Sequence, residues 1–98
     1  MSNADYVESL RQAIRRLYGC VSKHSSSIPV KETFNGQTVW DGVVEVFDLI
    51  DCPNANRCYA WSYAEGKETK YYVVLEIPPV NSAKTAVQAS IVADHRKK

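Results

Sequence analysis

Three cysteines and two histidines are the residues of this chain with the most distinctive chemistry. Cys20 and His24 have C-x3-H spacing and Cys52 and Cys58 have C-x5-C spacing, which together offer the ligand set of a tetrahedral Cys3His zinc site. Structural zinc ligands more often form tight C-x2–4-C pairs, and Cys58 falls within a run of strand character, where buried free thiols are common. A Cys20–His24 nucleophile pair lacks a third group to orient the imidazole. We therefore expect no metal, no cofactor and no catalytic residue.

Three carboxylates are candidates for proton transfer or for ligand contact. Asp41 and Glu45 share one face of a predicted strand, but four residues along a strand span about 13 Å, too far for an acid/base pair. Glu76, on a neighbouring predicted strand, can lie closer, depending on the register. Because solvated carboxylates on a sheet face explain the pattern better than proton transfer does, we favour a non-enzymatic protein over an enzyme.

Aromatic residues alternate at Tyr59, Trp61 and Tyr63, which places them on one face of a strand. Such a row can stack on a base, a sugar or a cationic ligand. It is equally typical of ordinary packing within a sheet or an interface, which we favour.

Arg11, Arg15 and Arg16 form a basic edge on the first predicted helix. The helix–sheet–helix order loosely resembles that of double-stranded RNA-binding domains, which direct clustered basic residues at phosphates. The net charge of this chain is only +1. Nucleic-acid binding is therefore a weak alternative.

The elements that position these residues follow from periodicity and turn signals. Apolar residues at helical spacing predict an amphipathic helix over 4–18, and Gly19 suits its C-terminal cap. Asn35-Gly36 is a strong hairpin signal, and Pro29 confines its segment to a sheet edge or to irregular structure. Extended segments are predicted over 28–34, 37–50, 57–63 and 70–77, a polar connector over 20–27 and a final helix over 83–94.

These elements predict an α+β fold: a helix, a four-stranded, mainly antiparallel sheet and a second helix, with both helices on one face. The other face would then expose apolar side chains, which marks an interface or a ligand groove. We expect a homodimer anchored by Phe47, Trp61 and Val74. One alternative is a ligand pocket on that face, and another is a sheet that buries both faces within the monomer. The candidate interface or ligand residues are Asp41, Val43, Glu45, Phe47, Tyr59, Trp61, Tyr63, Val74 and Glu76.

Composition sets the broad class. A chain of 98 residues is expected to form one domain, with residues 1–4 a tag or disordered and residues 95–98 a frayed tail. No apolar stretch is long enough for a membrane span, so no membrane association is expected. An odd number of cysteines favours free thiols in a reducing compartment, and hence a cytoplasmic protein.

Several segments resemble a family of uncharacterised bacterial proteins of roughly one hundred residues. The resemblance is carried by Ile28–Ile50, with its IPVKETFNGQTVWDGVVEVFDL core, and by the segments 57–62 and 74–82. Members are associated with environmental bacteria, some with mobile integron gene cassettes. The resemblance implies a stand-alone bacterial protein and assigns no catalytic residue. A Gly-His-Pro type turn is the family expectation near Asp51-Cys52-Pro53, so the resemblance implies an incidental role for Cys52.

Overall fold

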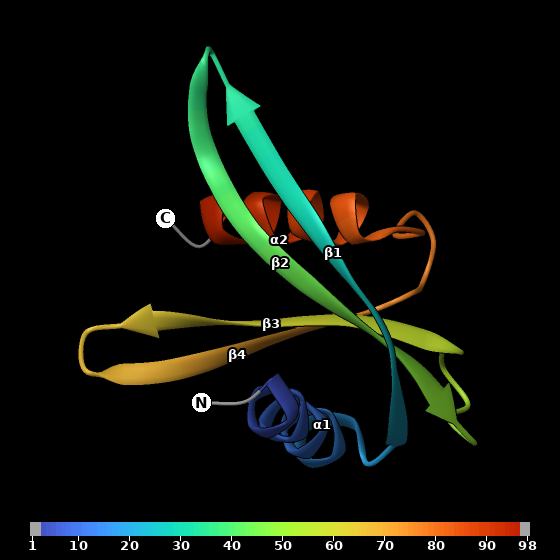
Figure 1. The fold of residues 1–98 in the computed structure, drawn as a ribbon. Helices are drawn as coiled ribbons and strands as arrows, with labels where there is room; N and C mark the ends of the chain where they lie inside the picture. Colours follow the sequence, from blue (N-terminus) through green and yellow to red (C-terminus); the bar gives the residue numbers. More distant parts are fainter. Residues whose placement is uncertain (1–2, 97–98) are drawn as a thin grey trace.

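The computed structural model describes the backbone of residues 3–96 and the side-chain surroundings of residues 5–93. The elements, in chain order, are α1 (Asn3–Tyr18), β1 (Val21–Phe34), β2 (Gln37–Ile50), β3 (Arg57–Glu65), β4 (Glu68–Leu75) and α2 (Ala83–Arg96). The strands form one antiparallel sheet in the order β1-β2-β3-β4 (Figure 1). The predicted α+β class and element order are confirmed. Of the predicted tag and tail, residues 1–2 and 97–98 lie outside the described residues, and the rest belong to the two helices.

The hairpin between β1 and β2 follows the local sequence signals. Asn35 and Gly36 both have positive φ, at 52° and 77°, which is the conformation that a type I′ turn requires. Pro29 lies on β1, an edge strand of the sheet, where its missing N–H removes no bond of the ladder. Both predictions are confirmed.

β1 begins much earlier than the sequence pattern indicates. The segment 20–27 was predicted as a polar connector, but residues from Val21 onward pair with the C-terminal half of β2, with a register shift between His24 and Ser26. That prediction is wrong because the apolar half of β2 needs a partner for its backbone groups, and the largely exposed serines of an edge strand can supply one. β4 also ends at Leu75, two residues before the predicted end of the fourth strand.

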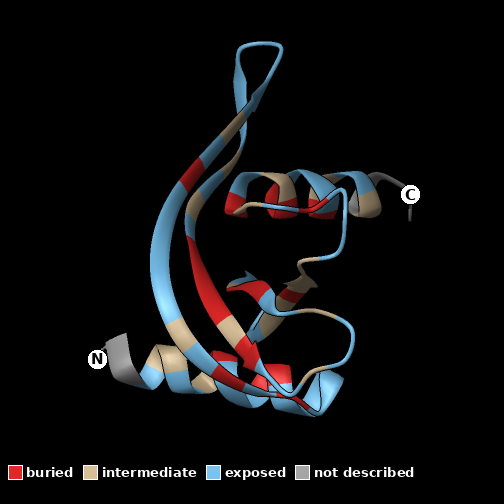
Figure 2. Cartoon of the chain, turned by 90° about the vertical axis from the view of Figure 1, so that its right-hand side faces the viewer, coloured by how far each residue is buried: buried red, intermediate tan, exposed pale blue. Residues whose placement is uncertain are grey.

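The two helices cover opposite faces of the sheet. Val44 and Val46 belong to the hydrophobic cluster that includes α2, whereas Phe47 and Leu49 belong to the cluster that includes α1. Because successive strand residues point to opposite faces, these two pairs face opposite ways. Figure 2 shows one helix on each side of the β3–β4 hairpin. The expectation of both helices on one face is therefore wrong: β2 is apolar on both faces, and each face needs a cover.

β2 parts from β3 partway along the sheet. The two strands pair only from Glu45–Ala60 to Asp48–Arg57, whereas β1 with β2 and β3 with β4 pair along most of their lengths. From Gln37 to Val44, β2 pairs with β1 on one side and, within residues 3–96, with no strand on the other. This part of the β1–β2 hairpin projects as an arm away from the β3–β4 hairpin (Figure 1).

The cysteines do not follow the prediction of free thiols. Cys20 and Cys52 form a disulfide with their Cα atoms 5.6 Å apart, joining the α1–β1 junction to the segment after β2. Cys58 is free and buried on β3, and burial raises the pKa of its thiol to about 12. The free-thiol expectation is thus wrong for two of the three cysteines. The cytoplasmic location loses this support and stays a prediction.

Candidate functional site

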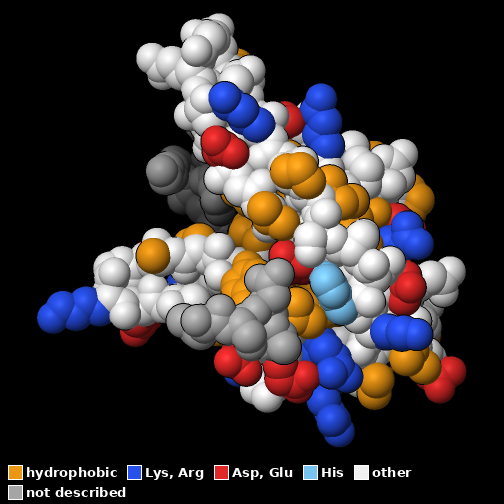
Figure 3. Space-filling view, in the orientation of Figure 1, with side chains coloured by type: hydrophobic (Ala, Val, Ile, Leu, Met, Phe, Trp, Pro, Cys, Tyr) orange, Lys and Arg blue, Asp and Glu red, His pale blue; other side chains and the backbone are white. Residues whose placement is uncertain are grey.

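A cavity of about 610 Å³ lies where β2 and β3 part, a volume within the usual range of small-molecule sites. We call it the cleft. Figure 3 shows a notch between the arm and the β3–β4 hairpin, with hydrophobic side chains at its inner end. The cleft is lined by residues of α1, β1, β2 and β3, namely Tyr6, Ser27, Trp40, Asp41, Gly42, Val43, Glu45, Trp61, Ser62 and Tyr63.

Aromatic rings in mutual contact form part of this lining. The Trp40 and Trp61 ring centroids are 5.5 Å apart in an edge-to-face arrangement, and Trp61 stacks on Tyr72 with centroids 5.1 Å apart and planes 5° apart. Tyr63, which is 42% exposed, lies 6.5 Å from Tyr72. A Cβ atom on Gly42 would lie 3.2 Å from the Trp40 ring, so the absence of a side chain at this position leaves room for the indole. Ring–ring contacts therefore fix the aromatic part of the cleft.

Two carboxylates give the cleft its charge. Glu45 is only 6% exposed, and its Oε1 accepts hydrogen bonds from Ser27 Oγ and from His24 Nε2, the latter at 2.8 Å. Asp41 is exposed, and within the described residues its carboxylate has no hydrogen bond or ion pair. Lys31 stands opposite Asp41 in the β1–β2 register without an ion pair to it. The described lining holds two acidic residues and no lysine or arginine.

Helix α1 closes part of the cleft over β3. The Ser62 N–H donates to Tyr6 Oη at 3.0 Å, and the Ser62 hydroxyl lies 3.3 Å from the same oxygen. Ser62 lies beyond the last β2–β3 pair, so its amide has no partner on β2. Tyr6 therefore satisfies a polar group that the parting of the strands leaves open.

Ser27, His24 and Glu45 include the residue types of a catalytic triad but not its connectivity. In a triad the imidazole takes the proton of the hydroxyl, and the carboxylate orients the imidazole. Here the hydroxyl and the imidazole both contact Glu45, and no Ser27–His24 hydrogen bond occurs in the described part of the chain. This arrangement holds the carboxylate in place, as a binding site requires, and does not activate the serine.

A metal site is not assembled from the cysteines and histidine considered above. Cys20 and Cys52 bond to each other, Cys58 is buried within β3, and His24 contacts Glu45. Among the described residues, no group of three or more potential metal ligands comes together.

The cleft brings together five of the nine residues that the sequence nominated. These are Asp41, Val43, Glu45, Trp61 and Tyr63. The Asp41 and Glu45 side chains occupy the same face, as alternation predicts, and the structure adds a gap between strands beside them.

The other four nominated residues lie outside the cleft. Phe47 is fully buried in the cluster with α1, and Val74 packs against the cluster with α2. Tyr59 is buried in the α2 cluster, and its Oη donates to Glu76 Oε2 at 2.5 Å. Burial and, to a smaller extent, the Glu76 contact raise the pKa of Tyr59 to about 12.

The expected dimer anchors do not form a common surface. Phe47 lies on the α1 face, whereas Trp61 and Val74 lie on the α2 face. Phe47 is 0% exposed and Trp61 is 4% exposed. The predicted placement of these anchors on one open face of the sheet is wrong, because the prediction assumed that both helices cover the opposite face. The homodimer stays a prediction, without the contacts on which it was based.

Five lining residues were missed by the sequence reasoning: Tyr6, Ser27, Trp40, Gly42 and Ser62. Ser27 was assigned to a connector and Tyr6 to the buried stripe of a helix, so neither had a reason to stand near a strand gap. Trp40 and Gly42 carry a usable signal, because a glycine two residues from a tryptophan within a strand can mark the close approach of a side chain.

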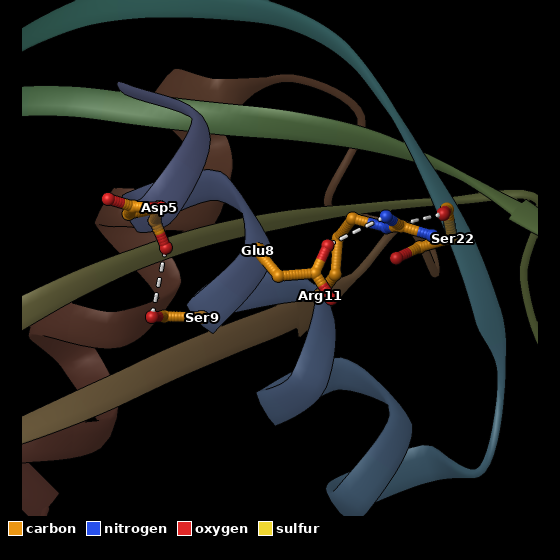
Figure 4. A network of polar contacts seen from close by, with 5 residues as sticks. All are labelled: Asp5, Glu8, Ser9, Arg11 and Ser22. Atoms are coloured by element: carbon orange, nitrogen blue, oxygen red, sulfur yellow. Dashed lines mark hydrogen bonds and ion pairs between the residues drawn. The ribbon is translucent and has the colours of Figure 1, made fainter. Parts of the chain in front are cut away.

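The basic edge of α1 is partly committed to contacts within the chain. Arg11 donates from Nε to the Ser22 carbonyl at 3.1 Å and from Nη1 to Glu8 at 2.9 Å (Figure 4). Arg15 and Arg16 are exposed. Nucleic-acid binding stays a weak prediction, with one of its three arginines engaged.

Among the described residues, neither helix has the length and the apolar character that a membrane span requires.

Comparison with models of protein families, with curated proteins and with solved structures finds no match. The resemblance to small bacterial and integron-associated proteins therefore remains a prediction, and the function has to be argued from the cleft.

Proposed function

We propose that this chain is a non-enzymatic binding module that takes an organic cation, an amine or a guanidinium group, in the cleft between β2 and β3. The observation that carries the proposal is the lining itself, which combines aromatic rings with Asp41 and Glu45 and, among the described residues, holds no lysine or arginine. This develops the alternative of an aromatic-lined ligand pocket.

Both parts of the lining attract a cation. Trp61 is 4% exposed and stacks on Tyr72, so the rings that a cation can reach are those of the half-buried Trp40 and the exposed Tyr63. A cation over such a ring gains about 0.5–1 kcal/mol when exposed and about 2 kcal/mol when desolvated. The exposed Asp41 carboxylate has no partner in the described chain, so pairing with a ligand breaks no existing contact. Glu45 is already held by Ser27 and His24, so little ordering is needed when the ligand binds.

The two tryptophans of the chain are Trp40 and Trp61, and both line the cleft. Intrinsic fluorescence therefore reports on the site without a label. N-acetyl-arginine amide is expected to change the emission saturably, whereas N-acetyl-citrulline amide, a neutral analogue of similar shape, is expected to bind much more weakly. Equal binding of the two compounds would contradict the proposal.

Asp41→Asn removes one charge of the cleft and keeps the side chain's size. We expect it to weaken the affinity for N-acetyl-arginine amide about two- to fivefold, the range of a partly exposed ion pair. Asp51→Asn is the matched control, because Asp51 is exposed after the far end of β2 and its φ of 55° suits asparagine. An unchanged affinity in Asp41→Asn would show that the charge is not used.

A further inference from the structure

Building on the proposed function, we infer that the cation is the side chain of an extended peptide, which adds as a strand to the open edge of β2 beside the cleft. The peptide carries lysine or arginine opposite Asp41 and an apolar residue opposite Val43. Strand addition of this kind uses main-chain hydrogen bonds for affinity and side-chain contacts for specificity.

The β2 edge is open at these two residues. The Leu49 N–H donates to the Asn56 carbonyl, on the β3 side of β2, so the backbone groups of every second residue counted back from Leu49 face that side. After Glu45, which still pairs with Ala60, this series reaches Val43 and Asp41. Val43 stands opposite Pro29 of β1, and a proline there fits a pair that exchanges no hydrogen bonds.

The facing edge of β3 is less accessible. Its Ser62 N–H already donates to Tyr6 Oη from α1. A peptide that entered the cleft would therefore pair with β2, whose Asp41 and Val43 amides have no partner among the described residues.

The side chains on this edge indicate which peptide fits. Asp41 and Val43 point to the same face, two residues apart, and Val43 is 47% exposed. The Glu45 carboxylate lies next along that face. Opposite charges directly across a strand pair are favourable and like charges are not. A second copy paired through the same edge would bring its Asp41 and Glu45 close to those of the first, so a basic peptide is the better occupant.

The experiment uses the whole chain and a five-residue peptide, acetylated and amidated, with threonine at positions 1, 3 and 5, valine at position 2 and arginine at position 4. Antiparallel pairing with β2 then places the arginine opposite Asp41 and the valine opposite Val43, with the amides of both facing β2. Tryptophan fluorescence gives its affinity beside that of N-acetyl-arginine amide. The peptide is expected to bind at least about tenfold more tightly. N-methylation of its arginine and valine amides, which face β2, should weaken the affinity of the peptide about tenfold, the effect of losing two hydrogen bonds. N-methylation of the central threonine, whose amide faces away, is the matched control and should change affinity little.

The outcomes separate the two proposals. If the arginine compound binds and the peptide gains nothing, or if both methylated peptides bind alike, strand addition is overturned and cation binding stands. If neither the compound nor the peptide binds, the proposed function itself fails. If light scattering finds a dimer and the peptide does not bind to it, a second copy occupies the edge and the inference is overturned.

Discussion

At the scale of single residues, Tyr59 has a titration that the fold clearly alters. Burial and its contact with Glu76 raise its pKa from 10 to about 12, so the folded chain holds the phenolic proton more tightly than the unfolded chain. The resulting contribution to stability is present in full below pH 10 and is lost as the pH rises toward 12.

Tyr59→Phe tests this link. At pH 7 the variant should lose about 1 kcal/mol of unfolding free energy with the hydrogen bond to Glu76. Between pH 10 and 12 its stability should fall less steeply than that of the wild type. Urea unfolding across this range measures both effects, and Tyr63→Phe, at an exposed tyrosine, is the control. A wild-type slope in Tyr59→Phe would contradict the assignment.

Residue types alone identified some of the side chains that line the cleft, but not all of them. Asp41, Glu45 and Trp61 were nominated because carboxylates and alternating aromatics suit ligands. Tyr6 and Ser27 could not be nominated, because each reaches the cleft through a long-range contact, Tyr6 with Ser62 and Ser27 with Glu45. Such contacts depend on the three-dimensional register, which local patterns do not contain.

At the scale of elements, turn chemistry was predictable and strand length was not. Asn35-Gly36 has a conformational requirement that two residues satisfy by themselves. The start of β1 depends instead on a partner twenty or more residues away, since Val21 pairs with Ile50. The serines of this segment gave no local sign of that pairing.

The disulfide is the second feature that connects distant elements. Cys20 and Cys52 are 32 residues apart, and closing a loop of this length stabilises a fold by about 3–4 kcal/mol in the chain-entropy description. Reduction, or the paired change Cys20→Ser with Cys52→Ser, should lower the unfolding free energy by about that amount. Cys58→Ser is not a suitable control because Cys58 is buried, so Ser25→Ala, at an exposed serine of β1, serves instead.

Thiol counting decides the same question independently. Denatured without reductant, the oxidised protein should release one titratable thiol, from Cys58, and three after reduction. Three thiols before reduction would restore the expectation of free cysteines.

At the scale of the whole molecule, the element order followed from the sequence, but the assignment of helices to faces did not. β2 carries apolar side chains on both faces, with Val44 and Val46 on one and Phe47 and Leu49 on the other. That pattern indicates two covers, yet it leaves open whether a second copy or a second helix supplies one of them. In the structure, α2 covers one face and α1 the other, and a gap between β2 and β3 stays open beside them.

Phe47 distinguishes these two ways of covering the sheet. Because it is 0% exposed within one chain, Phe47→Ala should lower the unfolding free energy by about 3–5 kcal/mol and leave the solution mass of the folded protein unchanged. Phe47→Leu keeps most of the volume and remains measurable if the alanine variant does not fold. Val39→Ala, on the exposed arm, should change stability by no more than about 0.5 kcal/mol. If light scattering instead finds a wild-type dimer that either Phe47 variant converts to a folded monomer, then Phe47 meets a second copy and the cover by α1 is not its main contact.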